Sequence, residues 1–205
     1  MKTYQLNVAG ITRELPLISI ADNLKIASFV VLGDTELVTA ASPLIAAKLP
    51  AVDIIVTAEA KGIPLAHEVS RQLDMKNYIV ARKSIKPYMM DPLIHEVQSI
   101  TTQQKQTLCL DRKDINFIKD KRVALIDDVI STGESLSVLE DLVEKAGGQV
   151  VAKAAILAEG NAASREDIPL IYVIDHIWAK KVSRHCPCPV DVVSNTGCAI
   201  CRDTQ

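Results

Sequence analysis

Residues 123–135 read Val123-Ala-Leu-Ile-Asp-Asp-Val-Ile-Ser-Thr-Gly-Glu-Ser135. The apolar run Val123–Ile126 predicts a buried strand, and two carboxylates follow it at once. Asp127 and Asp128 can accept hydrogen bonds from vicinal hydroxyls or hold a hydrated divalent cation. The loop behind them, residues 131–135, can surround a phosphate at a helix N-terminus. The stretch therefore predicts a sugar-phosphate site at the end of a strand.

Predicted strands and helices alternate on both sides of this stretch. The other strands are expected at Val52–Ala58, Tyr78–Ala81, Val150–Leu157 and Leu170–Ile174, and the helices at Thr35–Leu49, Ile63–Leu73 and Leu136–Ala146. Continuous apolar strands that alternate with helices are typical of a parallel sheet covered on both faces. We therefore predict an α/β protein in which residues 34–175 form the core, around a central parallel sheet with helices on both faces.

Several of these elements have clear end signals. Asp34 is the expected N-cap of the first helix, and Pro43 is expected to shorten or kink that helix. Gly62 and Pro64 open the second helix, because proline is tolerated in a first turn. Cys109 lies in an apolar run and is predicted to be a core residue.

Three segments lie outside the alternating pattern. Within the N-terminal segment, residues 1–33, residues 3–20 alternate loosely around an Ala9-Gly10 turn, which predicts a hairpin or two extended segments. Residues 83–122 form two apolar arms around a polar stretch, and a long insertion of this kind is usually functional or mobile. Residues 176–205 form a Cys-rich C-terminal tail.

The composition limits the partners of the chain. Only 3% of its residues are aromatic, so aliphatic side chains must fill the core. A net charge of −2 provides no global field for nucleic acid or acidic membranes, so an anionic ligand requires local positive charge. Residues 1–6 lack a signal-peptide pattern, and no apolar run approaches the roughly 20 residues that cross a bilayer. We therefore expect a cytoplasmic protein that binds neither nucleic acid nor membranes.

Residues 123–135 resemble the thirteen-residue phosphoribosyl-pyrophosphate motif of the type I phosphoribosyltransferases, with the two acids and Thr-Gly in register. The resemblance implies the fold of that family, and it implies that Asp127 and Asp128 hold the ribose 2- and 3-hydroxyls. It implies Mg²⁺ as a cofactor that accompanies phosphoribosyl pyrophosphate. It also implies a 5-phosphate site formed by Ser131, Thr132, Gly133, Glu134 and Ser135.

Two ordinary alternatives exist for parts of this motif. Two acids after a strand can form a capped strand end on the surface. Ser131 and Glu134 also fit a capping box, in which the hydroxyl loop serves only to begin a helix. A capping box does not explain the acid pair, however, and ligands of open α/β sheets bind at the carboxyl ends of strands.

Residues 57–66 extend the resemblance to the adenine and xanthine branch of the family. They are similar to its pyrophosphate loop, in which Ala60, Lys61 and Gly62 would approach the anion. They are also similar to the corresponding loop of the purine operon repressor of Gram-positive bacteria. The ordinary alternative for Lys61 is a solvated surface lysine.

Residues 81–87 resemble the Arg-Lys-x-x-Lys segment that follows the next strand in adenine phosphoribosyltransferases. The resemblance implies that Arg82, Lys83 and Lys86 bind pyrophosphate and supply the local positive charge; the alternative is a solvated cap. Residues 88–98 match the flexible loop of that branch poorly, so its catalytic details are not carried over. The insertion at 84–106 is expected to close over the site and exclude water.

The second substrate is expected to lie under a hood formed by residues 1–33. Phe29 and Val30 correspond loosely to an apolar segment that lies against the base in the adenine branch. Stacking on a purine and a place in the core are equally consistent with Phe29. Glu159 follows the predicted strand 150–157 and either faces the base or caps the strand.

The tail contains four clustered cysteines in a C-x-C…C-x-x-C arrangement. They are Cys186, Cys188, Cys198 and Cys201. Thiolates at such spacings can form a structural Zn²⁺ site, with His185 as a substitute ligand. A redox-active pair and free buried thiols are the alternatives.

The resemblance implies a glycosyltransferase, specifically a purine phosphoribosyltransferase. Such an enzyme transfers phosphoribosyl from phosphoribosyl pyrophosphate to an adenine- or xanthine-type nucleobase and releases pyrophosphate. A homodimer is expected from the resemblance as well. The alternatives are a non-catalytic regulatory protein that binds phosphoribosyl pyrophosphate, and an enzyme that acts on another nitrogen nucleophile.

Overall fold

The computed structural model describes residues 2–21, 24–98, 105–130, 133–158, 170–174 and 180–181. Its core is a five-stranded parallel sheet in the order β10-β9-β8-β4-β5. The strands are β4 (Ile54–Ala58), β5 (Ile79–Ala81), β8 (Arg122–Ile130), β9 (Gln149–Ala158) and β10 (Leu170–Ile174). The predicted α/β class and parallel sheet are therefore confirmed.

Strand β8 is longer than the sequence predicts. The apolar run ends at Ile126, but the ladder to β9 continues through Asp127 opposite Ala155 and on to Ile130 opposite Ala158. The two acids therefore lie inside the last part of the strand and not in a loop behind it. Pairing with β9 outweighs the low strand propensity of aspartate.

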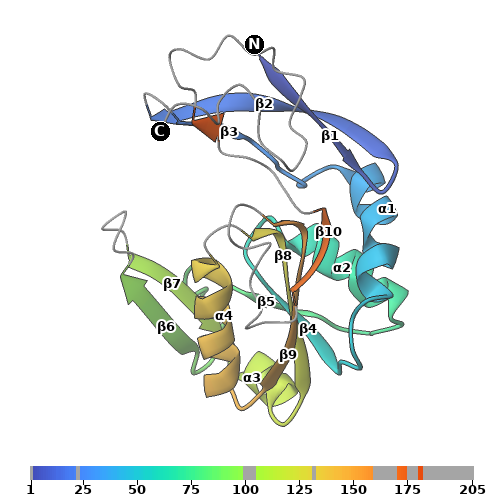
Figure 1. Ribbon diagram of the computed structural model, residues 1–205. Helices are drawn as coiled ribbons and strands as arrows, with labels where there is room; N and C mark the ends of the chain where they lie inside the picture. Colours follow the sequence, from blue (N-terminus) through green and yellow to red (C-terminus); the bar gives the residue numbers. More distant parts are fainter. Residues whose placement is uncertain are drawn as a thin grey trace, which may run out of the picture.

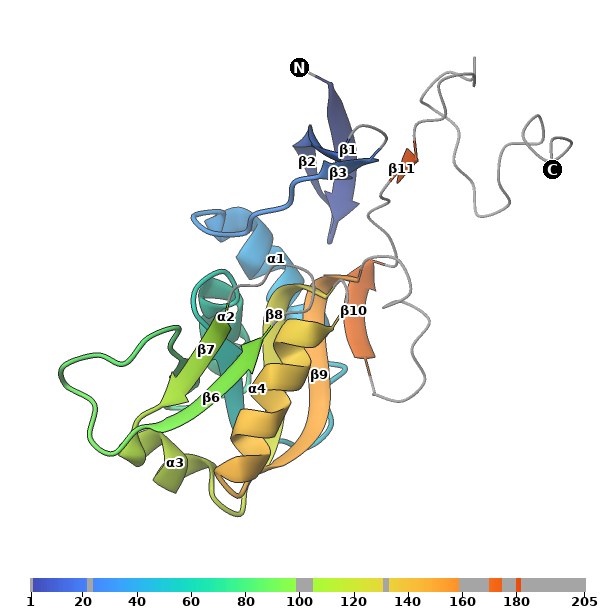
Figure 2. The ribbon, with the colours of Figure 1, turned by 90° about the vertical axis from the view of Figure 1, so that its left-hand side faces the viewer.

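Helices cover both faces of the sheet, as predicted. Helices α1 (Thr35–Ala46) and α2 (Ile63–Gln72) pack on one face, over Ile55, Ala124 and Ile126. Helices α3 (Arg112–Ile118) and α4 (Glu134–Lys145) pack on the other face, over Val56 and Leu125. Figures 1 and 2 show α4 on one side of the sheet and α1 with α2 on the other.

Helix α1 begins as the sequence predicts. The Asp34 side chain accepts a hydrogen bond from the Leu37 N–H and is the N-cap. The helix contains Pro43 and ends at Ala46, three residues before the predicted end. In α4, the fully buried Lys153 of β9 pairs with Glu140 at 2.5 Å, which holds the middle of the helix on the sheet.

The insertion after β5 forms an antiparallel hairpin, β6 (Leu93–Gln98) and β7 (Lys105–Leu110), followed by α3. The two arms are confirmed, whereas α3 has no counterpart in the sequence analysis. His95 fastens the hairpin to α4, because its ring lies 2.6 Å from the Lys145 ammonium and 3.4 Å from the Asp141 carboxylate. The end of β6 and the start of β7 lie toward the N-terminal end of α4 (Figure 2). Closure over the site stays a prediction.

The N-terminal hood is a small antiparallel sheet of β1 (Thr3–Val8), β2 (Ile11–Ala21), β3 (Leu24–Ala27) and β11 (Lys180–Lys181). The predicted hairpin is confirmed, with Ala9 and Gly10 both at positive φ in its turn. Figure 1 shows the hood beyond the carboxyl ends of the central strands. β11 belongs to the predicted tail, so part of that tail joins the hood. The domain boundaries at 33 and 175 stay predictions.

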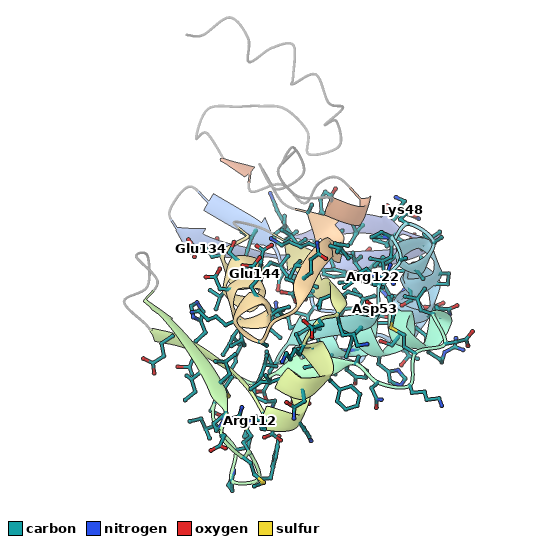
Figure 3. All side chains as sticks on the ribbon, turned by 90° about the horizontal axis from the view of Figure 1, so that it is seen from below. Lys48, Asp53, Arg112, Arg122, Glu134 and Glu144 are labelled. Atoms are coloured by element: carbon teal, nitrogen blue, oxygen red, sulfur yellow. The ribbon has the colours of Figure 1, made fainter. Side chains whose placement is uncertain are left out.

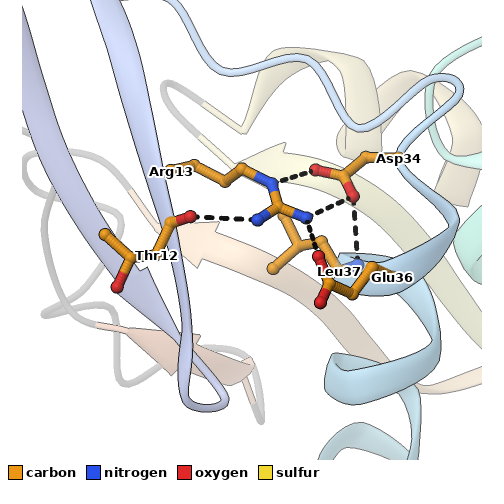
Figure 4. Close-up of polar contacts among 5 residues, drawn as sticks. All are labelled: Thr12, Arg13, Asp34, Glu36 and Leu37. Carbon is orange, nitrogen blue, oxygen red and sulfur yellow. Dashed lines mark hydrogen bonds and ion pairs between the residues drawn. The ribbon is translucent and has the colours of Figure 1, made fainter.

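One arginine fastens the hood to the core. Arg13 of β2 donates to both carboxylate oxygens of Asp34, at 2.7 and 2.9 Å, and to Glu36 at 2.7 Å. Figure 4 shows the guanidinium against the first turn of α1. These bonds hold the pKa of Asp34 below its usual range, so the carboxylate is charged at neutral pH.

A second ion pair closes the opposite end of the sheet. Asp53, just before β4, accepts the backbone N–H of Arg122 at 2.8 Å and two guanidinium bonds at 3.1 and 2.8 Å. Figure 3, seen from below, shows the two residues close to each other. This pair joins the amino ends of β4 and β8, far from their carboxyl ends.

Candidate functional site

The sheet has its topological switch point between β4 and β8. The chain leaves β4 toward β5 on one side and leaves β8 toward β9 on the other, while β4 and β8 are neighbours. Connections that depart in opposite directions leave a crevice at the carboxyl ends of such strands, and ligands of open α/β sheets bind there. The predicted site residues after β4 and in β8 fall at the carboxyl ends of these two strands.

The acid pair, Asp127 and Asp128, lies at the carboxyl end of β8. Asp128 is only 4% exposed and Asp127 is half-buried. Burial and the neighbouring Asp128 carboxylate raise the pKa of Asp127 to about 7. Burial also raises the pKa of Asp128, while the nearby Lys61 charge opposes that shift. Two neighbouring acids, one buried and one half-buried, are costly to ionise together, so the pair is suited to a ligand that supplies donors or positive charge.

The acid pair fits a divalent cation or a pair of hydroxyls. The Oδ2 atom of Asp128 is buried and has no hydrogen-bond partner among the described residues. A buried polar atom of this kind usually has a partner, and its absence points to a missing ligand. Hydrated Mg²⁺ and vicinal hydroxyls both offer what a carboxylate pair accepts. In the part of the chain that the structure describes, no group of three metal-ligating side chains is present.

The cationic loop, residues 59–62, follows β4 and contains a cis Glu59–Ala60 peptide. Its Lys61 ammonium lies 3.8 Å from Oδ2 of Asp128. Gly62 is packed so closely that a Cβ would lie 2.3 Å from Oγ1 of Thr57 and 3.0 Å from the carbonyl oxygen of Ile126. Only glycine fits there, so the loop approaches the end of β8 closely. The predicted Lys61 and Gly62 are therefore brought to the acid pair.

The cationic segment, residues 82–86, follows β5. Arg82 exchanges two backbone hydrogen bonds with Cys109 of β7, at 2.9 and 2.8 Å, which fixes its place beside the hairpin. Arg82 and Lys83 both contact Glu59 of the cationic loop. The Lys86 ammonium instead donates to Oγ of Ser84 at 2.7 Å. The structure thus brings Arg82 and Lys83, but not the Lys86 ammonium, into contact with the loop.

The hydroxyl loop leads from β8 to α4. Ser131 and Thr132 lie outside the described residues. Gly133, at a φ of 81°, is the N-cap of α4 and provides no side-chain cap, while Glu134 and Ser135 are exposed in the first turn. The capping-box alternative is therefore wrong, because Ser131 is not the N-cap. The helix N-terminus lies where a phosphate would meet its N–H groups.

The residues predicted to face a base differ in their exposure to solvent. Phe29 is 6% exposed and belongs to the core cluster that includes α1. Val30, in contrast, is 50% exposed. Burial in the cluster favours the core alternative for Phe29, and a base contact by either residue stays a prediction. Glu159 lies outside the described residues.

Only one of the five cysteines, Cys109, lies within the described residues. Cys109 is buried, as predicted, and burial raises the pKa of its thiol. The four tail cysteines, 186, 188, 198 and 201, and His185 lie outside the described residues, so the zinc site stays a prediction.

Two residues of the site were missed by the sequence analysis. Glu59 joins the cationic loop to the cationic segment, and Thr57 lies beneath Gly62 with its buried Oγ1 unpartnered among the described residues. One signal was present for Glu59, because an acid directly before Ala60-Lys61-Gly62 is unexpected in a loop that binds an anion. Thr57 had no signal beyond its place at the end of a predicted strand.

Known proteins of one domain family are similar to this chain in sequence. The sequence model of the phosphoribosyl transferase domain matches residues 44–195. A hypoxanthine/guanine phosphoribosyltransferase of Methanococcus voltae is 35% identical over 114 residues, 56% of this chain and 57% of that protein. A xanthine phosphoribosyltransferase of Clostridioides difficile is 31% identical over 111 residues, 53% of this chain and 57% of that protein. The match thus spans just over half the length of these curated relatives.

Solved structures show the same fold. The adenine phosphoribosyltransferase of Thermoanaerobacter pseudethanolicus superposes with a TM-score of 0.64 at 20% identity, covering 78% of this chain and 94% of that one. The Saccharomyces cerevisiae enzyme, complexed with adenine, superposes with a TM-score of 0.61 at 15% identity, covering 84% and 94%. At such identities the likeness shows the fold alone.

The described residues contain no helix that is both long and apolar enough to span a membrane. The matched segment, residues 44–195, includes the whole central sheet, the acid pair and both cationic elements. Because the match covers well over half of the 205 residues, the chain belongs to the phosphoribosyl transferase domain family.

Proposed function

We propose that the protein is a purine phosphoribosyltransferase, a glycosyltransferase that moves phosphoribosyl from phosphoribosyl pyrophosphate to a purine base and releases pyrophosphate. The observation that carries the proposal is the 3.8 Å contact between Lys61 and Asp128. It joins an acid pair suited to ribose hydroxyls with a cationic loop suited to pyrophosphate. The names of the sequence relatives support purine bases.

Each part of the site has a role in this reaction. Asp127 and Asp128 accept hydrogen bonds from the ribose 2- and 3-hydroxyls, and residues 131–135 bind the 5-phosphate at the start of α4. Lys61, Arg82 and Lys83 bind the pyrophosphate, whose negative charge grows as its bond to C1 breaks. A Mg²⁺ ion held by the acid pair and the substrate oxygens would neutralise part of that charge.

The base is proposed to bind between the carboxyl ends of the central strands and the hood, near Val30. Contact of Glu159 with the base stays a prediction. Attack by a ring nitrogen on C1 forms the glycosidic bond as the C1–oxygen bond to pyrophosphate breaks. The hood lies beyond the carboxyl ends of the central strands (Figure 1), a place from which it could exclude water from a cationic sugar. A homodimer, a cytoplasmic location and a zinc-binding tail stay predictions.

The test is pyrophosphate release from phosphoribosyl pyrophosphate with Mg²⁺ and, in separate assays, adenine, hypoxanthine, guanine and xanthine. The proposal predicts base-dependent release with at least one purine. Tight binding of phosphoribosyl pyrophosphate with no release on any base would contradict the proposal. It would favour a non-catalytic regulatory protein instead.

A further inference from the structure

An acid stands among the cations of the proposed pyrophosphate site. Glu59 follows β4 directly, and its side chain is 25% exposed. Its Oε2 atom accepts the backbone N–H of Lys83 at 3.0 Å and lies 3.3 Å from Nε of Arg82. A carboxylate at this place lowers the positive potential that an anion needs, so electrostatic attraction does not explain it.

The contacts of Glu59 connect the two cationic elements. Its backbone N–H donates to the carbonyl of Ala81 at 2.9 Å, which extends the pairing of β4 with β5. Its side chain then crosses to the next two residues, Arg82 and Lys83. Cys109 holds Arg82 from the opposite side through two backbone bonds. The start of the cationic segment is thus fixed between the hairpin and the cationic loop.

The carboxylate is charged in this position. The Lys83 N–H, and then the charges of Arg82, Lys86 and Lys83, hold the pKa of Glu59 below its usual range against the effect of burial. A charged acceptor makes the stronger hydrogen bond with a backbone N–H. Lys61 lies two residues further along the same loop, so Glu59 joins the loop that holds Lys61 to the cations after β5.

We propose that Glu59 is a positioning residue for pyrophosphate: its carboxylate fixes Arg82 and Lys83 to the cationic loop so that they and Lys61 meet one pyrophosphate group. This inference rests on the proposed function, because it specifies the half of the site that holds the leaving group. Glu59 itself does not touch the substrate in this account. Its contribution is preorganisation, which a mobile pair of cations could not supply.

The structure provides a matched control. Asp53 makes the same kind of contacts, with one backbone N–H and the guanidinium of Arg122, at the opposite end of the sheet. Calorimetric titrations of the full chain and of the Glu59→Ala, Glu59→Gln and Asp53→Ala variants would use two probes, magnesium pyrophosphate and ribose 5-phosphate. Thermal unfolding would report the stability of each variant.

The positioning role predicts a selective loss. Glu59→Ala should bind pyrophosphate about tenfold more weakly, because the hydrogen bond and the ion pair are both lost. Glu59→Gln keeps an acceptor for the Lys83 N–H and should lose about threefold. Ribose 5-phosphate affinity should stay unchanged in both variants. Asp53→Ala should unfold at a lower temperature and bind both probes normally.

Three results would overturn the inference. Unchanged pyrophosphate affinity in Glu59→Gln, which keeps the shape of the side chain, would show that the carboxylate charge has no such role. Equal losses for both probes would show a general structural role instead. Failure of the unaltered chain to bind either probe would refute the proposed function, and the positioning role with it, whereas the first two results leave the proposed function intact.

Discussion

The Lys61 ammonium lies 3.8 Å from Oδ2 of Asp128, so the cation of one loop faces the buried acid of the neighbouring strand. The lysine side chain is 51% exposed, whereas the aspartate is buried. The Lys61 charge therefore partly offsets the burial of Asp128 and stands at the boundary between the proposed ribose and pyrophosphate sites. This contact joins the two proposed sites.

Replacing Lys61 tests that boundary. Lys61→Met keeps the length of the side chain and removes the charge. The substitution should raise the KM for phosphoribosyl pyrophosphate by about tenfold, because the negative pyrophosphate group loses the positive charge of Lys61. The KM for the base should change little. Steady-state kinetics would show this split, with Lys76→Met, an exposed lysine after α2, as the control. Equal changes in both KM values would contradict the assignment.

The raised pKa of Asp127 predicts how stability depends on pH. Because the pKa rises from 3.8 to about 7 on folding, the folded protein binds more protons than the unfolded chain between these values. This contribution to stability is complete below pH 3.8 and is lost as pH rises through 7. Asparagine does not ionise, so Asp127→Asn avoids this loss. The ligand-free variant should therefore be the more stable protein at pH 8, by on the order of 2 kcal/mol.

Thermal unfolding of both proteins at pH 5 and pH 8 measures this difference. The unaltered protein should lose more stability than Asp127→Asn between the two pH values, whereas phosphoribosyl-pyrophosphate binding should be weaker in the variant. A gain in stability with a loss of function is expected where a binding site holds repelling charges. Identical pH slopes for the two proteins would show that ionisation of Asp127 does not destabilise the folded protein.

Gly62 gives a steric prediction. In Gly62→Ala the new Cβ would lie within 3.2 Å of Cα of Asp127 as well as against Thr57, so the cationic loop must move away from β8. We expect a destabilisation of about 1–3 kcal/mol and a loss of pyrophosphate binding. Gly33→Ala is the control, because it adds strain at a positive φ but meets no atom within 4 Å. Normal pyrophosphate binding by Gly62→Ala would contradict the close approach.

Arg13 gives a prediction for the hood. Arg13→Gln removes the ion pairs with Asp34 and Glu36 that fasten β2 to α1. Amide hydrogen exchange in β1 and β2 should become faster, and the KM for the base should rise while that for phosphoribosyl pyrophosphate stays the same. Arg71→Gln, which removes an ion pair within α2, is the matched control. Unchanged exchange in Arg13→Gln would show that the hood is held by its apolar contacts alone.

The core and the centre of the site were predictable from the sequence because both depend on local patterns. Apolar runs that alternate with helical spacing identify a parallel sheet, and the acid pair is contiguous in residues 123–135. For Gly62, the sequence predicted only that the backbone approaches an anion closely, and it did not predict that a side chain there would clash with the protein itself. The structure adds that the nearest atoms belong to Thr57 and the end of β8.

The features that the sequence did not predict depend mostly on contacts between residues far apart in the chain. Helix α3 has seven residues, with one buried side chain, so its pattern is too short to recognise. The extension of β8 comes from its ladder with β9, which propensity opposes. Glu59 contacts a backbone N–H 24 residues away, and β11 pairs with β3 across most of the chain. No local pattern records such pairings.

The acid pair carries the central claim, and one measurement tests it most directly. The double variant Asp127→Asn, Asp128→Asn keeps the size of both side chains and removes their charge, so it should fold. Pyrophosphate release with Mg²⁺, phosphoribosyl pyrophosphate and the best purine should fall at least about a thousandfold, because the ribose and the cation lose their acceptors. Release at the rate of the unaltered protein, from a variant shown by circular dichroism to be folded, would contradict the account.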